Sequence, residues 1–285
     1  MEQKRFSPAR IIAECAIMIA LATILAILKM VNLPYGGEIT LASMLPLVVI
    51  SYRHGMKWGF LSSFVFGAVS LVLGLNTLTY VTGVASVIAV IMIDYIIAFG
   101  IIGLSGLARK IESQRNALMI GGLIACAARY MCHVISGATV WAGLSVPTAA
   151  ALSYSFIYNA TYMIPETIIL VSVAYFIGSS FDLKSYRPKS LIQTKKNVPV
   201  ILTVLKFASI ACVSAALIID TVSVFSKIQN AETGEFDITG IANVNLPLVL
   251  IASGIALAVF IAYLIVYFVT KKNNPPVENT EEENV

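Results

Sequence analysis

Long apolar segments are the feature of this sequence that most limits its fold. Eight of them can be counted, at about residues 11–30, 40–52, 57–75, 84–108, 116–138, 149–178, 198–225 and 246–270. A helix that crosses a bilayer needs about 20 mainly apolar residues, and a helix satisfies its own backbone polar groups, as lipid requires. Of all residues 58% are hydrophobic and 12% charged, too few charges for a soluble domain, which averages about 25%. The sequence predicts an all-α integral membrane protein.

The basic residues predict the orientation of these spans. With a cytoplasmic N-terminus, 15 of the 19 Lys and Arg residues fall on the cytoplasmic side, as the positive-inside rule demands. The short second span, 40–52, is kept because its removal would invert every later loop. The first apolar run is long and no small-x-small cleavage site follows it, so we expect a retained helix rather than a signal peptide. Both termini are expected in the cytoplasm.

Composition divides the chain into four parts. Residues 1–178 hold six spans, and 179–197 are polar and basic, which indicates a cytoplasmic linker. Residues 198–270 add two spans, interpreted as a lipid-facing addition or as a surface for docking or dimer contacts. The acidic, proline-containing tail 271–285 is expected to be disordered.

Several kinds of chemistry are not indicated. The chain has no GxxxxGK[ST] phosphate loop, no HExxH and no GxSxG motif. Its four cysteines lie in apolar segments without a CxxC pair, so neither a disulfide nor a metal site is predicted. The basic residues are scattered between spans, so no nucleic-acid partner is expected.

Polar and aromatic groups from three spans reach a similar depth. At about 1.5 Å per helical residue, Asp94, His133 and Asn159 lie roughly 22, 25 and 28 Å above the cytoplasmic ends of their helices. Tyr95 and Tyr154 are near them, and Trp141 is in the outer loop. An acidic residue within a span costs about 2.5–3.5 kcal/mol to insert and is a functional candidate by default. A carboxylate among aromatic rings suits an organic cation, and the imidazole and amide can hydrogen-bond a heterocycle.

These residues also allow structural interpretations. Asp94 could pair with Arg129, and His133 could be a satisfied core histidine. Trp141 and Tyr154 could belong to the aromatic belts at the membrane interfaces.

Four further groups are read mainly as structural. Arg129 and Glu166 are expected below the pocket, as an internal ion pair. Glu14 could snorkel or meet a partner, and His54 is expected in a cytoplasmic turn.

A stripe of small residues marks the first span. Ala16 and Ala20 lie one helical turn apart, and such a stripe lets another helix approach closely. It could pack within the chain or dock another membrane protein.

Four segments carry a resemblance to a known family. "GGEITLASMLPLVVISYRHGMKWG", "IDYIIAFGIIGLSGLA", "HVISGATVW" and "YSFIYNATYMIPE" are similar to the thiamine-specific substrate-binding subunit (S-component) of energy-coupling-factor transporters. The resemblance covers about residues 5–178 and leaves out the last two spans.

The resemblance implies a six-helix unit of the bacterial plasma membrane that captures thiamine from outside and releases it inside. It also implies that the unit docks on one membrane coupling protein and two ABC-type ATPases, which use the ATP, so that this chain needs no cofactor and is not an enzyme. The family's ligand positions match Asp94, Tyr95, His133, Trp141, Tyr154 and Asn159. Tyr35 and Tyr80 are possible additions, and Ala16 and Ala20 match the docking face.

Three other functions remain open at this stage. The ligand could be a related vitamin or a thiamine precursor. The chain could be a membrane enzyme with Asp94 and His133 as acid and base. It could also be a stand-alone secondary transporter.

Overall fold

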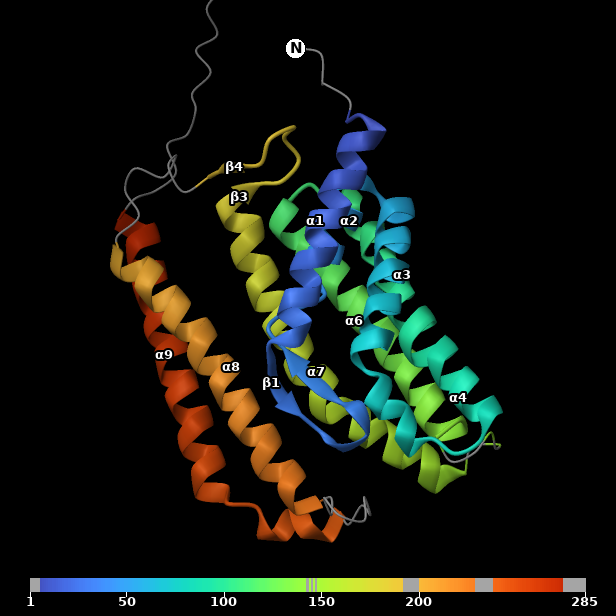
Figure 1. Ribbon diagram of the computed structural model, residues 1–285. Helices are drawn as coiled ribbons and strands as arrows, with labels where there is room; N and C mark the ends of the chain where they lie inside the picture. The colour runs from blue at the N-terminus through green and yellow to red at the C-terminus, as the bar shows by residue number, and fades with distance from the viewer. Residues whose placement is uncertain are drawn as a thin grey trace, which may run out of the picture.

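The computed structural model describes residues 6–141, 144, 146, 148–191, 200–228 and 238–273, and most of them are helical (Figure 1). Its α-helices are α1 (Pro8–Ile27), α2 (Leu45–His54), α3 (Met56–Leu73), α4 (Val84–Val90), α5 (Ala98–Gly100), α6 (Gln114–Thr139), α7 (Ala149–Ser180), α8 (Val200–Ile228) and α9 (Leu246–Asn273). A π-helical segment, η3 (Ile91–Ile97), and a 3-10 segment, η4 (Ile101–Lys110), connect with α4 and α5 into one helix over Val84–Lys110.

The remaining elements are short. Three are 3-10 turns: η1 (Pro34–Gly36), η2 (Leu75–Tyr80) and η6 (Ile238–Asn243). Two antiparallel hairpins pair β1 (Lys29–Asn32) with β2 (Glu38–Thr40), and β3 (Phe181–Asp182) with β4 (Lys189–Ser190). The first hairpin lies against the helices in the middle of the bundle (Figure 1).

Seven helices in the described residues are long and apolar enough to cross a membrane. They are α1, α3, the helix Val84–Lys110, α6, α7, α8 and α9. Their lengths of 18–32 residues meet the need for about 20. The prediction of an all-α membrane protein is confirmed.

The predicted second span is the exception. Residues 40–52 form the end of β2, a turn and the first part of α2, a helix of 10 residues. A helix of that length covers about 15 Å, half the apolar thickness of a bilayer. Every residue from Leu45 to Arg53 is buried, so the segment is apolar because protein surrounds it. The segment is shorter than a full-length span, as its sequence indicated, and it returns the chain to the end where α1 begins, because Arg53 and His54 at the end of α2 contact Glu14.

Local signals explain where three helices begin. The side chains of Ser7, Ser113 and Thr148 each accept a hydrogen bond from a backbone N–H in the first turn of α1, α6 and α7, which satisfies donors that a helix start leaves free.

Gly137 lets α6 and α7 approach closely, because a Cβ there would lie 2.4 Å from Ser155 Oγ.

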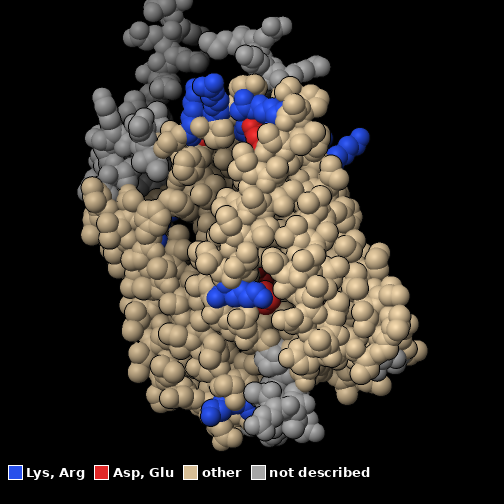
Figure 2. Space-filling view, viewed as in Figure 1, with Lys and Arg blue, Asp and Glu red and all other residues tan. Residues whose placement is uncertain are grey.

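Charge is unevenly distributed along the bundle. The start of α1 and the end of α9 lie at the same end of the molecule (Figure 1). Lys and Arg gather at this end on the face shown in Figure 2. This distribution agrees with the charge asymmetry seen in the sequence.

The predicted linker is partly structured. Its residues 181–190 include the β3–β4 hairpin, and the Arg53 guanidinium donates to the backbone carbonyls of Leu183, Ser185 and Tyr186. The hairpin is therefore fastened to the end of α2. Residues 192–199 of the linker region and the tail 274–285 lie outside the described residues.

The two C-terminal helices differ in burial. α8 contacts α7 and β1, and α9 packs on α8. Within the membrane-length window, 6% of α9 is buried against 39% of α6 and of α7. The interpretation as a lipid-facing addition therefore describes α9 better than α8.

Candidate functional site

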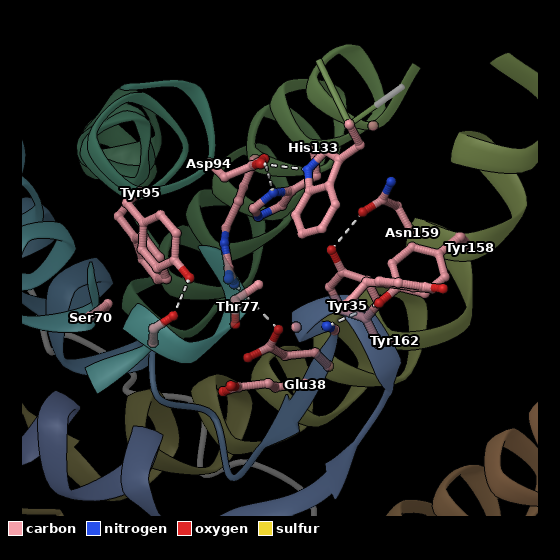
Figure 3. Close-up of a pocket in the computed structure, with 18 of the residues that line it drawn as sticks. Tyr35, Glu38, Ser70, Thr77, Asp94, Tyr95, His133, Tyr158, Asn159 and Tyr162 are labelled. Atoms are coloured by element: carbon pink, nitrogen blue, oxygen red, sulfur yellow. Dashed lines mark hydrogen bonds and ion pairs between the residues drawn. The ribbon is translucent and has the colours of Figure 1, made fainter. Parts of the chain in front are cut away.

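A cavity of about 810 Å³ is enclosed by the β1–β2 hairpin, η2, η3 and the facing sides of α3, α6 and α7. Its size falls within the range of small-molecule pockets, roughly 300–1,000 Å³. Its lining includes all eight residues that the sequence analysis named for ligand binding: Tyr35, Tyr80, Asp94, Tyr95, His133, Trp141, Tyr154 and Asn159. Figure 3 shows side chains from the hairpin, η3, α6 and α7 converging on this space.

Asp94 is a buried carboxylate in the lining of this cavity. Its carboxylate contacts His133 Nδ1 at 2.8 Å and accepts hydrogen bonds from Ser136 Oγ at 2.6 Å and Trp141 Nε1 at 3.1 Å. The residue is 8% exposed and sits on the π-helical segment, a local widening of the helix that is frequent at functional sites. The partners on α6 and at its end hold the carboxylate in one orientation at the cavity wall.

His133 presents an available ring nitrogen. Because an ionised carboxylate only accepts, Nδ1 must donate to Asp94. Nε2 is buried and has no hydrogen-bond partner among the described residues. A buried polar atom without a partner costs free energy, so this nitrogen is suited to a hydrogen bond from or to a ligand.

Aromatic rings cover two sides of the cavity. On one side, Tyr35 contacts Tyr80 and Trp141 edge-on, with centroid distances of 5.3 and 6.2 Å. On the other, Tyr154 stacks on Tyr158 at 5.9 Å. Rings in these positions offer their π faces to a cation, an attraction of about 2 kcal/mol or more when water is excluded.

The turn of the hairpin has an unusual backbone. Tyr35 has φ +63° and Gly36 φ +93°. Positive φ is uncommon for a residue with a side chain, and such strain concentrates at ligand sites. This turn directs the Tyr35 ring toward Trp141.

Asn159 and Tyr95 are held by the protein itself. The Asn159 amide donates to Ser155 O at 2.8 Å and accepts from Tyr162 Oη at 2.5 Å. Tyr95 Oη donates to Gly74 O at 3.2 Å, at the start of η2. These hydrogen bonds fix the two side chains in the cavity wall, and both residues still line the cavity.

A second buried carboxylate lies in the cavity lining. Glu166, 2% exposed, contacts Arg129 Nη1 at 3.3 Å and accepts from Thr40 Oγ1 at 2.7 Å. The predicted internal ion pair is confirmed, and Arg129 does not pair with Asp94. The expectation that the pair lies below the pocket was wrong, because the cavity continues along α6 and α7 to both residues. Depth counted along each helix did not predict the extent of the cavity, because the β1–β2 hairpin reaches Glu166 through Thr40.

Sequence reasoning missed several lining residues. Tyr158 and Tyr162 follow Tyr154 at intervals of four, so the three tyrosines share one helix face, and this period was the signal. Glu38 also lines the cavity and pairs with Lys29 across the hairpin. Two opposite charges on either side of a turn were the signal for that pair.

The groups expected on the cytoplasmic side form a partly buried network. Glu14 accepts from Arg10 at 2.8 Å and from Arg53 at 2.7 Å, and it contacts His54 Nε2 at 2.8 Å. Glu14 therefore meets partners within the chain. His54 ends α2 beside a turn, as expected, but its side chain is 1% exposed.

Ala16 and Ala20 lie on α1 and do not line the cavity. Both are exposed, so the stripe of small residues is not used for packing within the described part of the chain. It remains a surface for another molecule or for lipid.

Comparisons with known proteins agree with this geometry. A family model described as thiamine transporter protein (Thia_YuaJ) matches residues 12–184. The chain is 34% identical over 176 residues to the thiamine transporter ThiT of Bacillus subtilis (strain 168), a match that covers 56% of this chain and 85% of the relative. The resemblance to a thiamine transport family is confirmed. Helices α8 and α9 lie beyond the matched residues.

Proposed function

This chain belongs to the thiamine transporter family, a family of multi-pass membrane transporters and not of enzymes, and we propose that it is the thiamine-binding subunit of an energy-coupling-factor uptake transporter in a bacterial plasma membrane. The observation that carries the proposal is the buried carboxylate of Asp94 in an aromatic cavity. Because the family consists of transporters, the interpretation of Asp94 and His133 as the acid and base of an enzyme is rejected.

Thiamine supplies groups that match the cavity. Its thiazolium ring is a permanent cation, which suits the Asp94 carboxylate and the rings of Tyr35 and Trp141. Its aminopyrimidine carries donors and acceptors, which suit His133 Nε2 and the amide of Asn159. A neutral or anionic vitamin would leave the Asp94 charge buried without a counter-ion, and this disfavours the alternative ligands of those types.

We further propose that uptake is driven by partner proteins. The chain has no phosphate loop, so ATP would be hydrolysed by two ABC-type ATPases attached to a membrane coupling protein. The exposed Ala16 and Ala20 support docking of that protein on α1, because small side chains allow close helix contact. A stand-alone secondary transporter would need no such surface.

Tryptophan fluorescence tests the ligand assignment directly. The chain has two tryptophans, Trp58 and Trp141, and only Trp141 lines the cavity. Titration of the purified protein with thiamine should quench the emission saturably, and Trp141→Phe should abolish the quenching. An unchanged signal up to millimolar thiamine would refute the assignment.

The coupling proposal has a separate test. Ala20→Leu should abolish thiamine uptake by cells that hold the complete transporter, while purified Ala20→Leu still binds thiamine as the wild type does. The matched control is Ile17→Leu, a change at an exposed position of the same helix that adds no bulk. Full uptake by Ala20→Leu, or uptake by this chain alone in liposomes, would contradict the proposed docking.

A further inference from the structure

Helix α8 lies outside the family match but contacts the wall of the cavity. It packs on α7 and on β1 of the hairpin, and Figure 1 shows it between α9 and these two elements. The hairpin turn and β2 contribute Tyr35, Gly37, Glu38 and Thr40 to the cavity lining. α8 is therefore one residue layer away from the proposed ligand.

The closest link is an aromatic pair. Phe225, near the end of α8, is 5% exposed, and its ring meets that of Tyr158 on α7 at a centroid distance of 5.9 Å and an interplanar angle of 62°. Such edge-to-face pairs contribute about 0.5–1.5 kcal/mol beyond their buried area. Because Tyr158 also lines the cavity, Phe225 supports a wall residue from behind.

Tyr158 in turn holds the hairpin. Its hydroxyl accepts a hydrogen bond from the backbone N–H of Gly37 at 3.0 Å. A Cβ at Gly37 would lie 2.8 Å from this hydroxyl and 2.9 Å from Tyr162 Cδ1, so the hairpin rests directly on the tyrosine face of α7. Movement of Tyr158 would remove this support.

Two more contacts fix α8 in this place. Thr221, one turn before Phe225, donates to Thr161 O on α7 at 3.4 Å. Phe225 also belongs to the same buried apolar cluster as Val31 of β1 and Leu33 of the turn. The helix therefore touches both the hairpin and the residue on which the hairpin rests.

We infer that α8, through Phe225, is a positioning element of the binding site: it holds Tyr158 and the β1–β2 hairpin in the arrangement that the structure shows and slows ligand release. The inference rests on the proposed function, because the ligand is taken to be thiamine. We call the contact of Phe225 with Tyr158 the brace. Related interfaces differ mainly in their dissociation rates, so loss of the brace should raise the dissociation rate of thiamine and leave its association rate nearly unchanged.

The test compares two phenylalanines of α8 in the full-length protein. Phe225→Ala removes the brace, and Phe207→Ala is the matched control, because Phe207 pairs with Phe176 of α7 at 4.5 Å and lines no part of the cavity. Thiamine association and dissociation rates are measured by stopped-flow fluorescence of Trp141. Phe225→Leu, which keeps most of the apolar volume, serves as the conservative variant.

We expect Phe225→Ala to raise the dissociation rate about 3- to 10-fold, the change that corresponds to the loss of one aromatic pair. Phe207→Ala should stay within about twofold of the wild type, and Phe225→Leu should recover much of the loss. Equal acceleration by both alanine variants would show that any weakening of α8 has this effect and would overturn the assignment to Phe225. An unchanged dissociation rate in Phe225→Ala would overturn it as well.

Hydrogen exchange separates this inference from the ligand proposal. Without any ligand, Phe225→Ala should speed amide exchange in residues 29–40, including the Gly37 amide, and Phe207→Ala should not. If the wild type fails to bind thiamine but this difference is found, the brace stands and the proposed function falls. If thiamine binds but exchange in the hairpin is the same in all variants, the brace falls and the proposed function stands.

Discussion

Two buried carboxylates line the same cavity, and their partners differ in charge. Glu166 faces the permanent cation of Arg129 and a threonine hydroxyl. Asp94 faces a serine hydroxyl, an indole N–H and an imidazole. Glu166 thus faces a permanent cation, whereas the basic group that contacts Asp94 is an imidazole.

The difference in their partners indicates different roles for the two carboxylates. A buried charge that lacks a permanent counter-ion is costly, and it is tolerated where a cationic ligand supplies one. Asp94 is therefore the group that a cation from outside would neutralise. Glu166 already has its counter-ion, and its pair with Arg129 joins α6 and α7, while Thr40 attaches the end of the hairpin.

The largest expected effect comes from removing the Asp94 charge. Asp94→Asn keeps the side-chain shape, but the thiamine Kd should rise at least about a hundredfold, because loss of one partner of a buried charge pair costs about 2–5 kcal/mol. Isothermal titration calorimetry measures it. The control, Asp94→Glu, keeps the charge and should bind within about tenfold of the wild type. A thiamine Kd within threefold of the wild type in Asp94→Asn would contradict the different roles given to Asp94 and Glu166.

Removal of the Glu166 charge should act on stability instead. Glu166→Gln leaves Arg129, whose side chain is 11% exposed, without its counter-ion, and breaking a buried pair in this way costs up to about 3–5 kcal/mol. We expect the melting temperature in detergent to fall by on the order of 10 °C, with a smaller change in thiamine affinity than in Asp94→Asn. An affinity loss as large as that of Asp94→Asn would mean that both acids serve the ligand.

A moderate effect is expected at the indole. Trp141→Phe removes the hydrogen bond from Nε1 to Asp94 and weakens the cation–π face, so the thiamine Kd should rise about tenfold. Calorimetry is the measurement, since this variant loses its fluorescence signal. Tyr130→Phe is the control, because Tyr130 lies on α6, which ends shortly before Trp141, and its hydroxyl donates to Phe156 O outside the cavity. Equal affinities of Trp141→Phe and the wild type would remove Trp141 from the site.

The smallest effect is expected when both charges of the ion pair are removed together. Arg129→Gln with Glu166→Gln leaves two neutral amides, and replacement of a whole buried ion pair is often close to neutral. The double variant should recover most of the melting temperature that Glu166→Gln loses. A double variant as unstable as the single one would show that the pair is needed for more than charge balance.

The sequence allowed most of the candidate site to be predicted, because polar groups are rare in apolar spans and each is informative. Asp94, His133 and Asn159 were recognised from their depth in three helices, and the structure places all three in the lining of one cavity. Tyr95, Tyr154 and Trp141 were named beside them from the sequence, and the family resemblance added Tyr35 and Tyr80 as possible members.

The parts that could not be predicted depend on tertiary packing. The short helix α2 is apolar because it is buried by protein, and its composition is the same as that of a lipid-facing segment. Glu38 and Thr40 reach the cavity through a hairpin that residue periodicity does not reveal. Phe225 looks like any lipid-facing residue in the sequence, and only its contact with Tyr158 distinguishes it.

The most direct test of the central claim is a double comparison of charge in the protein and in the ligand. Calorimetry would measure the binding of thiamine, and of an analogue whose thiazolium is replaced by an uncharged ring, to the wild type and to Asp94→Asn. The account predicts that the substitution weakens thiamine by at least about a hundredfold and the uncharged analogue by less than about threefold. Equal losses for both ligands would contradict the claim that Asp94 acts as the counter-ion of the thiazolium.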